Sequence, residues 1–381
     1  MANNKDKKIL NVPALRFPEF TDEWMPKTIN DLATVLGGGT PDTTIKSYWD
    51  GNIQWFTPSE IGKSKYVSLS SRTITEDGLN NSSAKLLPSY TILLSSRATV
   101  GECSITLHEC ATNQGFQSLI AKNCDIDFLY YLIQTKKKDL IRKACGSTFL
   151  EISTNEVRKI RTNVPSNTEQ KKIGALLSLI DKRIETQNKI IEKLETLIEG
   201  IRHNIFKQLR KNVGFNATIG NILSFEQPQR YIVSSAEYSN DDTFTPVLTA
   251  NKAFILGYTT ETDGIYSKGD CIIIDDFTLD CKYVSFPFKV KSSAIKILTA
   301  KNKFILRYTY EYLKSLELST EEHKRHYIAE VQPHSCVLPD ENTLKTIALV
   351  FENLACKLAD EQSLVLILNK QKQYLLSKMF I

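Results

Sequence analysis

The side chains best suited to metal chemistry in this sequence lie in the segment "EEHKRHYIAEVQPHSC". It contains His323, His326, His334 and Cys336, and imidazole nitrogen and thiolate sulfur are donors that zinc prefers. Their spacing matches no common zinc module. A polar surface segment is the simpler interpretation, so we predict no metal site.

Two adjacent carboxylates, Asp275 and Asp276 in "IIIDDFTLD", could in principle act as an acid–base pair. Adjacent side chains on a strand face opposite sides of the sheet. We therefore expect a polar recognition loop here and no catalytic pair.

The glycine-rich run from Gly37, "GGGTP", could cradle a phosphate, but it lacks the Lys-Ser/Thr ending of a phosphate loop and leads into no helical pattern. The sequence also contains no GxGxxG, GxSxG or HExxH, and the Asn/Asp-Pro-Pro-aromatic tetrapeptide of amino-methyltransferases is missing. We predict a tight turn into a recognition loop, with glycines that permit positive φ and close backbone approach. "NIQW" then begins a strand, and Trp49, Trp55 and Phe56 are expected to pack internally. No catalytic residue is predicted.

Length and charge set the broad class. The 381 residues suffice for two or three domains, and a net charge of +5 permits a nucleic-acid partner without requiring one. No signal peptide and no apolar run of membrane-spanning length is present. The eight cysteines form no CxxC pair and are expected to be reduced thiols. These features predict a cytoplasmic protein without a membrane partner.

The elements that must position any site come from an internal repeat. "NVPSNTEQKKIGALLSLIDKRI", starting at Asn163, is similar to "CVLPDENTLKTIALVFENLACKL", starting at Cys336. Each segment continues as a helix whose seam positions alternate steps of three and four, which is typical of a coiled coil. The predicted seam residues are Ile173, Leu177, Ile180, Ile184, Gln187, Ile191, Leu194, Ile198, Ile201, Ile347, Phe351, Leu354, Leu358, Glu361, Val365, Leu368 and Leu375.

Each seam spans roughly 50 Å at 1.5 Å per residue. The polar seam residue Gln187 aligns with Glu361; it either fixes the helix register or marks a kink or a tolerated substitution. The segments that precede the helices mix short β runs, Gly/Pro turns and few helices. We therefore predict an α+β chain of two divergent halves related by a pseudo-twofold axis. The expected parts are a first globular domain at 1–164 with a flexible tail at 1–14, a helix at 165–211, a second globular domain at 212–337 and a helix at 338–381.

Residues suited to contact bases and phosphates surround the apolar runs of both globular segments. Arg, Asn and Gln can bind base edges through two hydrogen bonds, and Lys, Ser and Thr commonly contact phosphates. The candidates are Thr40, Lys46, Tyr48, Ser95, Ser96, Arg97, Asn113, Gln114, Lys143, Ser147, Thr148, Gln229, Arg230, Asn251, Lys252, Thr278, Lys282, Lys324 and Arg325. From the residues alone, two related binding modules on a helical spacer are predicted.

The sequence resembles the specificity subunits of type I restriction–modification enzymes. In the first half the resemblance rests on "RFPEFTDEW", "GGGTPDTTIKSYWDGNIQWFTPSEI", "LLSSRATVGECSI", "ATNQGFQSLI" and "GSTFLEISTNEVRKI". In the second half it rests on "DGIYSKGDCIIIDDFTLDCKYVSFPF" and "LPDENTLKTIALVFENLACKL". "FEQPQRY" replaces "GGGTPDT" in the second half, so contacts do not transfer between halves.

The resemblance implies two target-recognition domains, each reading one half of a bipartite DNA target, with two long helices between them as an antiparallel coiled coil. It implies a non-catalytic subunit that binds two modification subunits, and restriction subunits through the complex. S-adenosylmethionine, ATP and Mg are then expected in the partners, and no cofactor in this chain.

Two alternatives remain open at this point. The chain could be a protein-interaction scaffold, or an orphan specificity subunit without active partners. An enzymatic reading, as a nuclease or zinc enzyme, is third.

Overall fold

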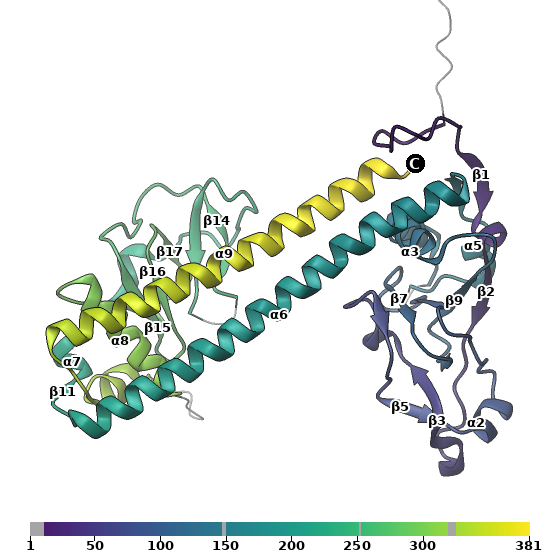
Figure 1. Ribbon diagram of the computed structural model, residues 1–381. Coiled ribbons are helices and arrows are strands. Elements are labelled where there is room, and N and C mark those ends of the chain that lie inside the picture. The colour runs from purple at the N-terminus through teal and green to yellow at the C-terminus, as the bar shows by residue number, and fades with distance from the viewer. Residues whose placement is uncertain (1–10, 147–149, 251–252, 319–324) are drawn as a thin grey trace, which may run out of the picture. The chain divides into compact units, whose positions relative to one another are not determined.

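The computed structural model describes residues 11–146, 150–250, 253–318 and 325–381. It divides into two compact units, one made of residues 1–187 and 364–381 and the other of residues 188–363. The fold mixes α-helices and β-strands in both units (Figure 1). Within the described residues, no helix is long and apolar enough to cross a membrane.

The first unit contains three sheets. A five-stranded sheet has the order β2-β9-β6-β7-β4, a three-stranded sheet has the order β5-β3-β8, and β1 pairs with β10. The strands are β1 Met25–Thr28, β2 Ala33–Gly37, β3 Trp49–Phe56, β4 Tyr66–Val67, β5 Arg72–Ile74, β6 Ile92–Leu94, β7 Cys103–Thr106, β8 Cys110–Thr112, β9 Gln117–Ala121 and β10 Arg161–Val164. The short helices are α1 Ile29–Leu32, α2 Glu76–Asn80, α3 Ile126–Thr135, α4 Lys137–Lys143 and α5 Thr154–Arg158, with 3-10 turns at Lys46–Tyr48 and Pro58–Glu60.

The second unit repeats this strand order with fewer strands. Its four-stranded sheet has the order β12-β18-β15-β16, its three-stranded sheet the order β14-β13-β17, and β11 pairs with β19. The strands are β11 Ala217–Thr218, β12 Ser224–Glu226, β13 Thr245–Leu248, β14 Ile255–Thr259, β15 Cys271–Asp275, β16 Cys281–Val284, β17 Lys289–Val290, β18 Ile295–Thr299 and β19 Ser335–Cys336. The short helices are α7 Ile219–Ile222, a 3-10 turn Pro228–Tyr231, α8 Lys303–Ser315 and a π-helical turn Tyr327–Val331.

The correspondence between the units extends to strand direction. β3 pairs antiparallel with β5 and parallel with β8, and β13 pairs antiparallel with β14 and parallel with β17. The central strands β6 and β15 are fully buried and apolar apart from Asp275, as strands covered on both faces must be. Helices α3 and α8 both begin at a capping side chain, Asp125 and Asn302, that accepts main-chain hydrogen bonds.

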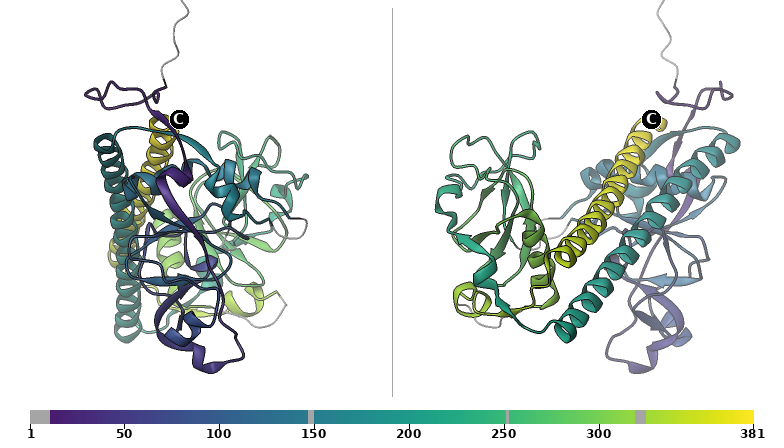
Figure 2. Two further views of the ribbon diagram at one scale, coloured as in Figure 1. Left: turned by 90° about the vertical axis from the view of Figure 1, so that its right-hand side faces the viewer. Right: turned by 60° about the vertical axis from the view of Figure 1, so that its left-hand side comes forward.

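Two long helices, α6 Asn167–Asn212 and α9 Glu341–Met379, each contribute to both units. In the first unit Asp181 pairs with Lys372 at 2.7 Å. In the second unit the rings of Phe206 and Phe351 stack with centroids 6.5 Å apart. The first half of α6 thus contacts the last part of α9, and the last part of α6 contacts the first half of α9. The helices therefore run antiparallel (Figures 1 and 2).

The burial pattern of these helices follows the predicted seam. Every predicted seam residue is buried or half-buried, from Ile173 to Ile201 on α6 and from Ile347 to Leu375 on α9. Most of the positions between them are exposed. The helices begin and end within three residues of the predicted 165–211 and 338–381. The compact units nevertheless divide inside both helices, because each half of a helix contributes to a different hydrophobic core.

The end of α9 is anchored in the first unit. The Phe380 ring stacks on Phe128 with centroids 5.2 Å apart and meets Trp24 edge-on at 6.4 Å. Arg16 donates two hydrogen bonds of 2.7 Å to Glu169 at the start of α6, and Glu169 is buried. This bond raises the pKa of Arg16. The motif "RFPEFTDEW" thus fastens the chain before β1 to the long helices.

The predicted flexible tail at 1–14 is wrong for its last four residues. Asn11 forms two hydrogen bonds with Trp24. The main-chain oxygen of Asn11 accepts from the Trp24 N–H at 2.9 Å, and the Asn11 side-chain amide donates to the main-chain oxygen of Trp24 at 2.7 Å. Pro13 is buried. Residues 1–10 lie outside the described part of the chain.

Candidate nucleic-acid interface

The "GGGTP" loop follows β2 and is held by main-chain contacts. Gly39 donates its N–H to Thr112 O at 2.8 Å and accepts from the Trp55 indole at 2.9 Å. A Cβ on Gly38 would lie 2.0 Å from Asn113 O. Close approach therefore requires glycine at this position, as predicted. The predicted positive φ is wrong, because none of Gly37, Gly38 and Gly39 has one.

The two tryptophans beside this loop are structural, as expected. Trp49 donates its indole N–H to Asp42 O at 3.1 Å, and its ring meets Trp55 edge-on at 5.1 Å. The Arg72 guanidinium lies 3.6 Å over the Trp49 ring. Both indoles and the side chain of Phe56 are buried. They tether the loop and are not available to stack on bases.

Three predicted contact residues meet beside this loop. Thr40 donates a hydrogen bond to the amide oxygen of Gln114. The Asn113 side-chain oxygen accepts from the Gly115 N–H at 2.8 Å. Gln114 and Lys46 are exposed, and Tyr48 is half-buried. The loops after β2 and β8 thus form one polar edge.

The loop after β6 differs from its prediction at two residues. Ser95 and Ser96 are fully buried, so neither hydroxyl can reach a base or a phosphate. Ser95 donates to Arg97 O at 2.9 Å. The main chain closes over both residues, because the Ser96 N–H donates to Gly115 O at 2.8 Å and Ser96 O accepts from the Ile152 N–H at 3.1 Å. Both serines are corrected from contact residues to structural ones.

Arg97 is the exposed cation at the tip of this loop. Its guanidinium pairs with Glu151 at 2.9 Å, and the two side chains are 43% and 38% exposed. Glu151 also exchanges two main-chain hydrogen bonds of 2.9 Å with Cys145. Cys145 and Glu151 are therefore held together beside Arg97. The predicted contacts Ser147 and Thr148 lie outside the described residues.

In the second unit the predicted residues occupy three separate turns. Gln229 and Arg230 are exposed on the 3-10 turn Pro228–Tyr231. Thr278 is exposed in the turn after β15, and Lys282 is half-buried on β16. Arg325 lies 4.0 Å from Asp276. The predicted Asn251, Lys252 and Lys324 are outside the described residues.

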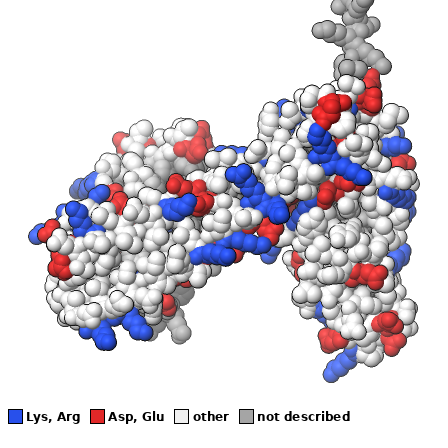
Figure 3. Space-filling model, viewed as in Figure 1, with Lys and Arg blue, Asp and Glu red and all other residues white. Residues whose placement is uncertain are grey.

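Lysine and arginine do not form a broad field on the visible face of the molecule. Figure 3 shows them interspersed with aspartate and glutamate over both units. This agrees with the small net charge of +5. On this face, an anion would be bound by a local group of side chains.

Comparison with known proteins supports the family resemblance for the first half of the chain. Residues 21–196 match the model of the type I restriction modification DNA specificity domain. This match confirms the resemblance to the specificity-subunit family. The MjaIX specificity subunit of Methanocaldococcus jannaschii is 39% identical over 180 residues, which are 45% of this chain and 42% of that protein. The EcoR124I/EcoR124II specificity subunit of Escherichia coli is 45% identical over 142 residues, which are 35% of each. The matched parts thus span less than half the length of these curated relatives.

Two solved structures share the fold over nearly the whole chain. The S subunit of a type I system from M. genitalium aligns with a TM-score of 0.63 at 18% identity, covering 97% of this chain and 99% of that one. A structure that describes complex assembly and conformational transition of the type I R-M system aligns at 0.56 and 13% identity, covering 95% and 98%. At these identities the likeness shows the fold.

The second unit contains a buried ion pair that the sequence did not indicate. Lys296 pairs with Asp276 at 2.9 Å, and both side chains are almost fully buried. Asp276 also accepts the Tyr327 N–H at 2.9 Å, and Lys296 donates to Gln227 at 3.1 Å. Asp275 instead accepts from the N–H groups of Phe277 and Thr278 at 2.9 Å. The two carboxylates therefore have separate structural partners.

Cysteine and histidine side chains of the specificity fold offer no described metal site. All eight cysteines are free. Burial raises the pKa of the Cys103 thiol to about 12 and that of Cys110 to about 11. Within the described ranges, no group of three or more His, Cys, Asp or Glu side chains is placed to hold an ion. His326 lies 2.7 Å from Glu330, and His323 is outside those ranges.

Proposed function

We propose that this chain is the DNA-binding specificity subunit of a type I restriction–modification complex. Each β unit reads one half of a bipartite DNA target. The chain itself is non-catalytic and directs adenine methylation and restriction by partner subunits. Because its target is DNA inside the cell, its place of action is the cytoplasm.

The observation that best supports two readers is the matching strand order of the two units. Four strands of the five-stranded sheet, β2-β9-β6-β7, correspond in order to β12-β18-β15-β16, and the two three-stranded sheets and the pairs β1-β10 and β11-β19 also correspond. We infer a duplication with pseudo-twofold symmetry. Such symmetry gives two related surfaces, which suits a target with two half-sites.

The long helices would set the distance between the half-sites. Their antiparallel contacts and buried seam support a coiled coil of roughly 50 Å at 1.5 Å per residue. A rigid spacer of this length would hold the readers about one DNA turn or slightly more apart, since one turn is roughly 34–36 Å.

The partners we propose are two modification subunits, with restriction subunits bound through the complex. S-adenosylmethionine, ATP and Mg would be bound by these partners. In the first unit the long helices expose Leu179, Leu366, Ile367 and Tyr374, each more than half exposed. Exposed apolar side chains can be covered by a protein partner, and we propose that a modification subunit covers these four.

The test is modified-adenine mapping of genomic DNA from cells that carry this chain with its modification subunit. The control cells carry the modification subunit alone. We expect a split motif with one methyl-adenine in each half, and only when this chain is present. With an active modification subunit, methylation that does not depend on this chain would contradict the proposal and favour a scaffold.

A further inference from the structure

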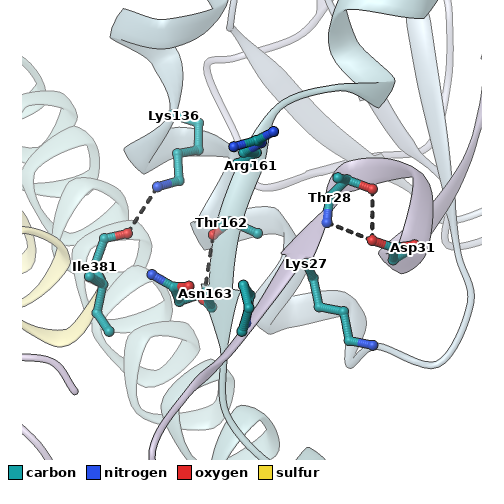
Figure 4. Close-up of a pocket in the computed structure, with 9 residues that line it drawn as sticks. Lys27, Thr28, Asp31, Lys136, Arg161, Thr162, Asn163 and Ile381 are labelled. Carbon is teal, nitrogen blue, oxygen red and sulfur yellow. Dashed lines mark hydrogen bonds between the residues drawn. The ribbon is translucent and has the colours of Figure 1, made fainter. Parts of the chain in front are cut away.

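A basic hollow lies on the first unit between α4 and the strand pair β1-β10. It consists of two adjoining hollows of about 380 and 580 Å³ that share Thr28 and Arg161. Figure 4 shows the first of them. We call the two together the α4–β10 hollow. Six cationic side chains line it: Lys27, Lys136, Arg142, Lys143, Lys159 and Arg161.

Side-chain carboxylates neutralise only half of this charge. Asp139 pairs with Arg142 at 2.8 Å. Glu156, beside the hollow, pairs with Lys143 at 3.3 Å and Lys159 at 3.1 Å. The third carboxylate, Asp31, accepts hydrogen bonds from Thr28 (Figure 4). These three side-chain carboxylates face six cations, so the side chains of the hollow carry an excess of positive charge.

Three cations of the hollow, Lys27, Lys136 and Arg161, pair with no carboxylate side chain among the described residues. Among the described residues, the side chains of Lys27 and Arg161 have no hydrogen-bond or ion-pair partner, and both are exposed. Lys136 donates to the main-chain oxygen of Ile381 at 2.9 Å (Figure 4). Burial lowers the pKa of Lys136. An anion in the hollow would stabilise all three charges.

The fold does not require these cations. Lys27 is paired with Thr162, and Thr28 with Arg161, across β1 and β10. The corresponding register in the second unit pairs Ala217 with Cys336 and Thr218 with Ser335. Ala217 and Ser335 thus occupy the positions of Lys27 and Arg161. The same strand pair forms with neutral residues, so a ligand is the better reason for the charges.

We propose that the α4–β10 hollow binds backbone phosphate of the DNA duplex whose half-site the first β unit reads. A guanidinium group binds phosphate oxygens through two parallel hydrogen bonds, and lysine adds a compact charge. Helix α4 ends at Lys143, and Cys145, two residues further on, pairs with Glu151, the partner of Arg97. A duplex that contacts the Arg97 loop would therefore present its backbone to the hollow. This inference rests on the proposed function and adds a contact that fixes the position of the DNA without reading its sequence.

The experiment replaces the hollow's cations with the residues of the second unit, as the double variant Lys27→Ala, Arg161→Ser in the full chain with its modification subunits. Binding is measured by fluorescence anisotropy over a range of salt concentrations, on a duplex with the mapped motif and on a scrambled duplex. Each lost phosphate contact lowers the slope of log K against log salt by about 0.9. We expect the slope to fall by about 2 on both duplexes, while the methylated motif stays the same.

A matched control removes two exposed cations from the second-unit part of α6, as Lys207→Ala, Lys211→Ser. It should leave the slope unchanged. If the hollow variant also keeps its slope, or loses its modification subunits instead of DNA affinity, the hollow does not bind DNA phosphate. Failure of the proposed function has a different result, because the unmodified chain would then show no preference for any split motif. The charge reversal Arg161→Glu is a second variant, and we expect it to weaken DNA binding more than Arg161→Ser does. An unchanged melting temperature would show that this variant is still folded.

Discussion

The two β units differ most clearly in the turn after their central strand. Ser96 follows β6 and Asp276 follows β15, and both are buried in the same main-chain frame. The Ser96 N–H donates to Gly115 O, and Ser96 O accepts from the Ile152 N–H. In the same way, the Asp276 N–H donates to Ala294 O, and Asp276 O accepts from the His326 N–H. All four main-chain bonds are between 2.7 and 3.1 Å long. At this shared position one unit buries a hydroxyl and the other a carboxylate.

The partners of these side chains differ in the same way. Among the described residues, the Ser96 hydroxyl has no hydrogen-bond partner. Asp276 instead pairs with Lys296, which also reaches Gln227 after β12. The first unit holds the corresponding loop after β2 with the Trp55 indole on Gly39. The strand frame is therefore common to both units, and each unit has its own means of fixing the loops at its edge.

The largest difference is expected between Asp276→Ala and Ser96→Ala. Removing Asp276 leaves the buried Lys296 ammonium unpaired, and breaking a buried ion pair costs about 3–5 kcal/mol of unfolding free energy. Ser96→Ala removes a hydroxyl that forms no bond, so its unfolding free energy should change by under about 0.5 kcal/mol. Chemical denaturation of the full chain measures both. Equal losses would show that the two turns are not held by different means.

Part of this arrangement follows from sequence periodicity. The heptad steps of α6 and α9 are local, so the helices and their buried positions were predicted to within a few residues. The turn at Gly38 and the strand containing "NIQW" also follow from local composition. The antiparallel course was expected from a symmetry argument, and the contacts Asp181–Lys372 and Phe206–Phe351 agree with it.

The misses involve contacts between distant residues. The sequence "SSR" predicts a polar loop tip. No neighbouring residue indicates that main-chain bonds to Gly115 and Ile152 bury this part of the loop. The Asp276–Lys296 pair depends on the alignment of β15 with β18. The lysine within the apolar run "SSAIKILT" was the available signal, because a buried lysine needs a partner. The α4–β10 hollow was not predicted as one site for the same reason, although its residues Lys143, Lys159 and Arg161 are of the types suited to phosphate contact.

Arg97→Ala should separate the functions of the two units. Arg97 is the exposed cation of the first unit's loop, and Phe277 holds the corresponding place after β15. A lost contact between arginine and a base edge costs about 1–3 kcal/mol of discrimination. We expect relaxed methylation at one half-site and an unchanged second half-site. Methylome sequencing measures this, and an unchanged motif with unchanged affinity would remove Arg97 from the interface.

Glu151→Gln tests the same arginine with a smaller effect. The Arg97–Glu151 pair is about two-fifths exposed on both sides. Solvent screening limits such pairs to about 0–1 kcal/mol of stability, so the melting temperature should barely change. The neutral amide removes a carboxylate that competes with DNA for the guanidinium, so affinity for the half-site of the first unit should rise slightly. Weaker binding would instead mean that the ion pair with Glu151 orients Arg97 for its DNA contact. Comparing Glu151→Gln with Arg97→Ala on the same duplex distinguishes an arginine that is released to the DNA from one that binds DNA while held in place.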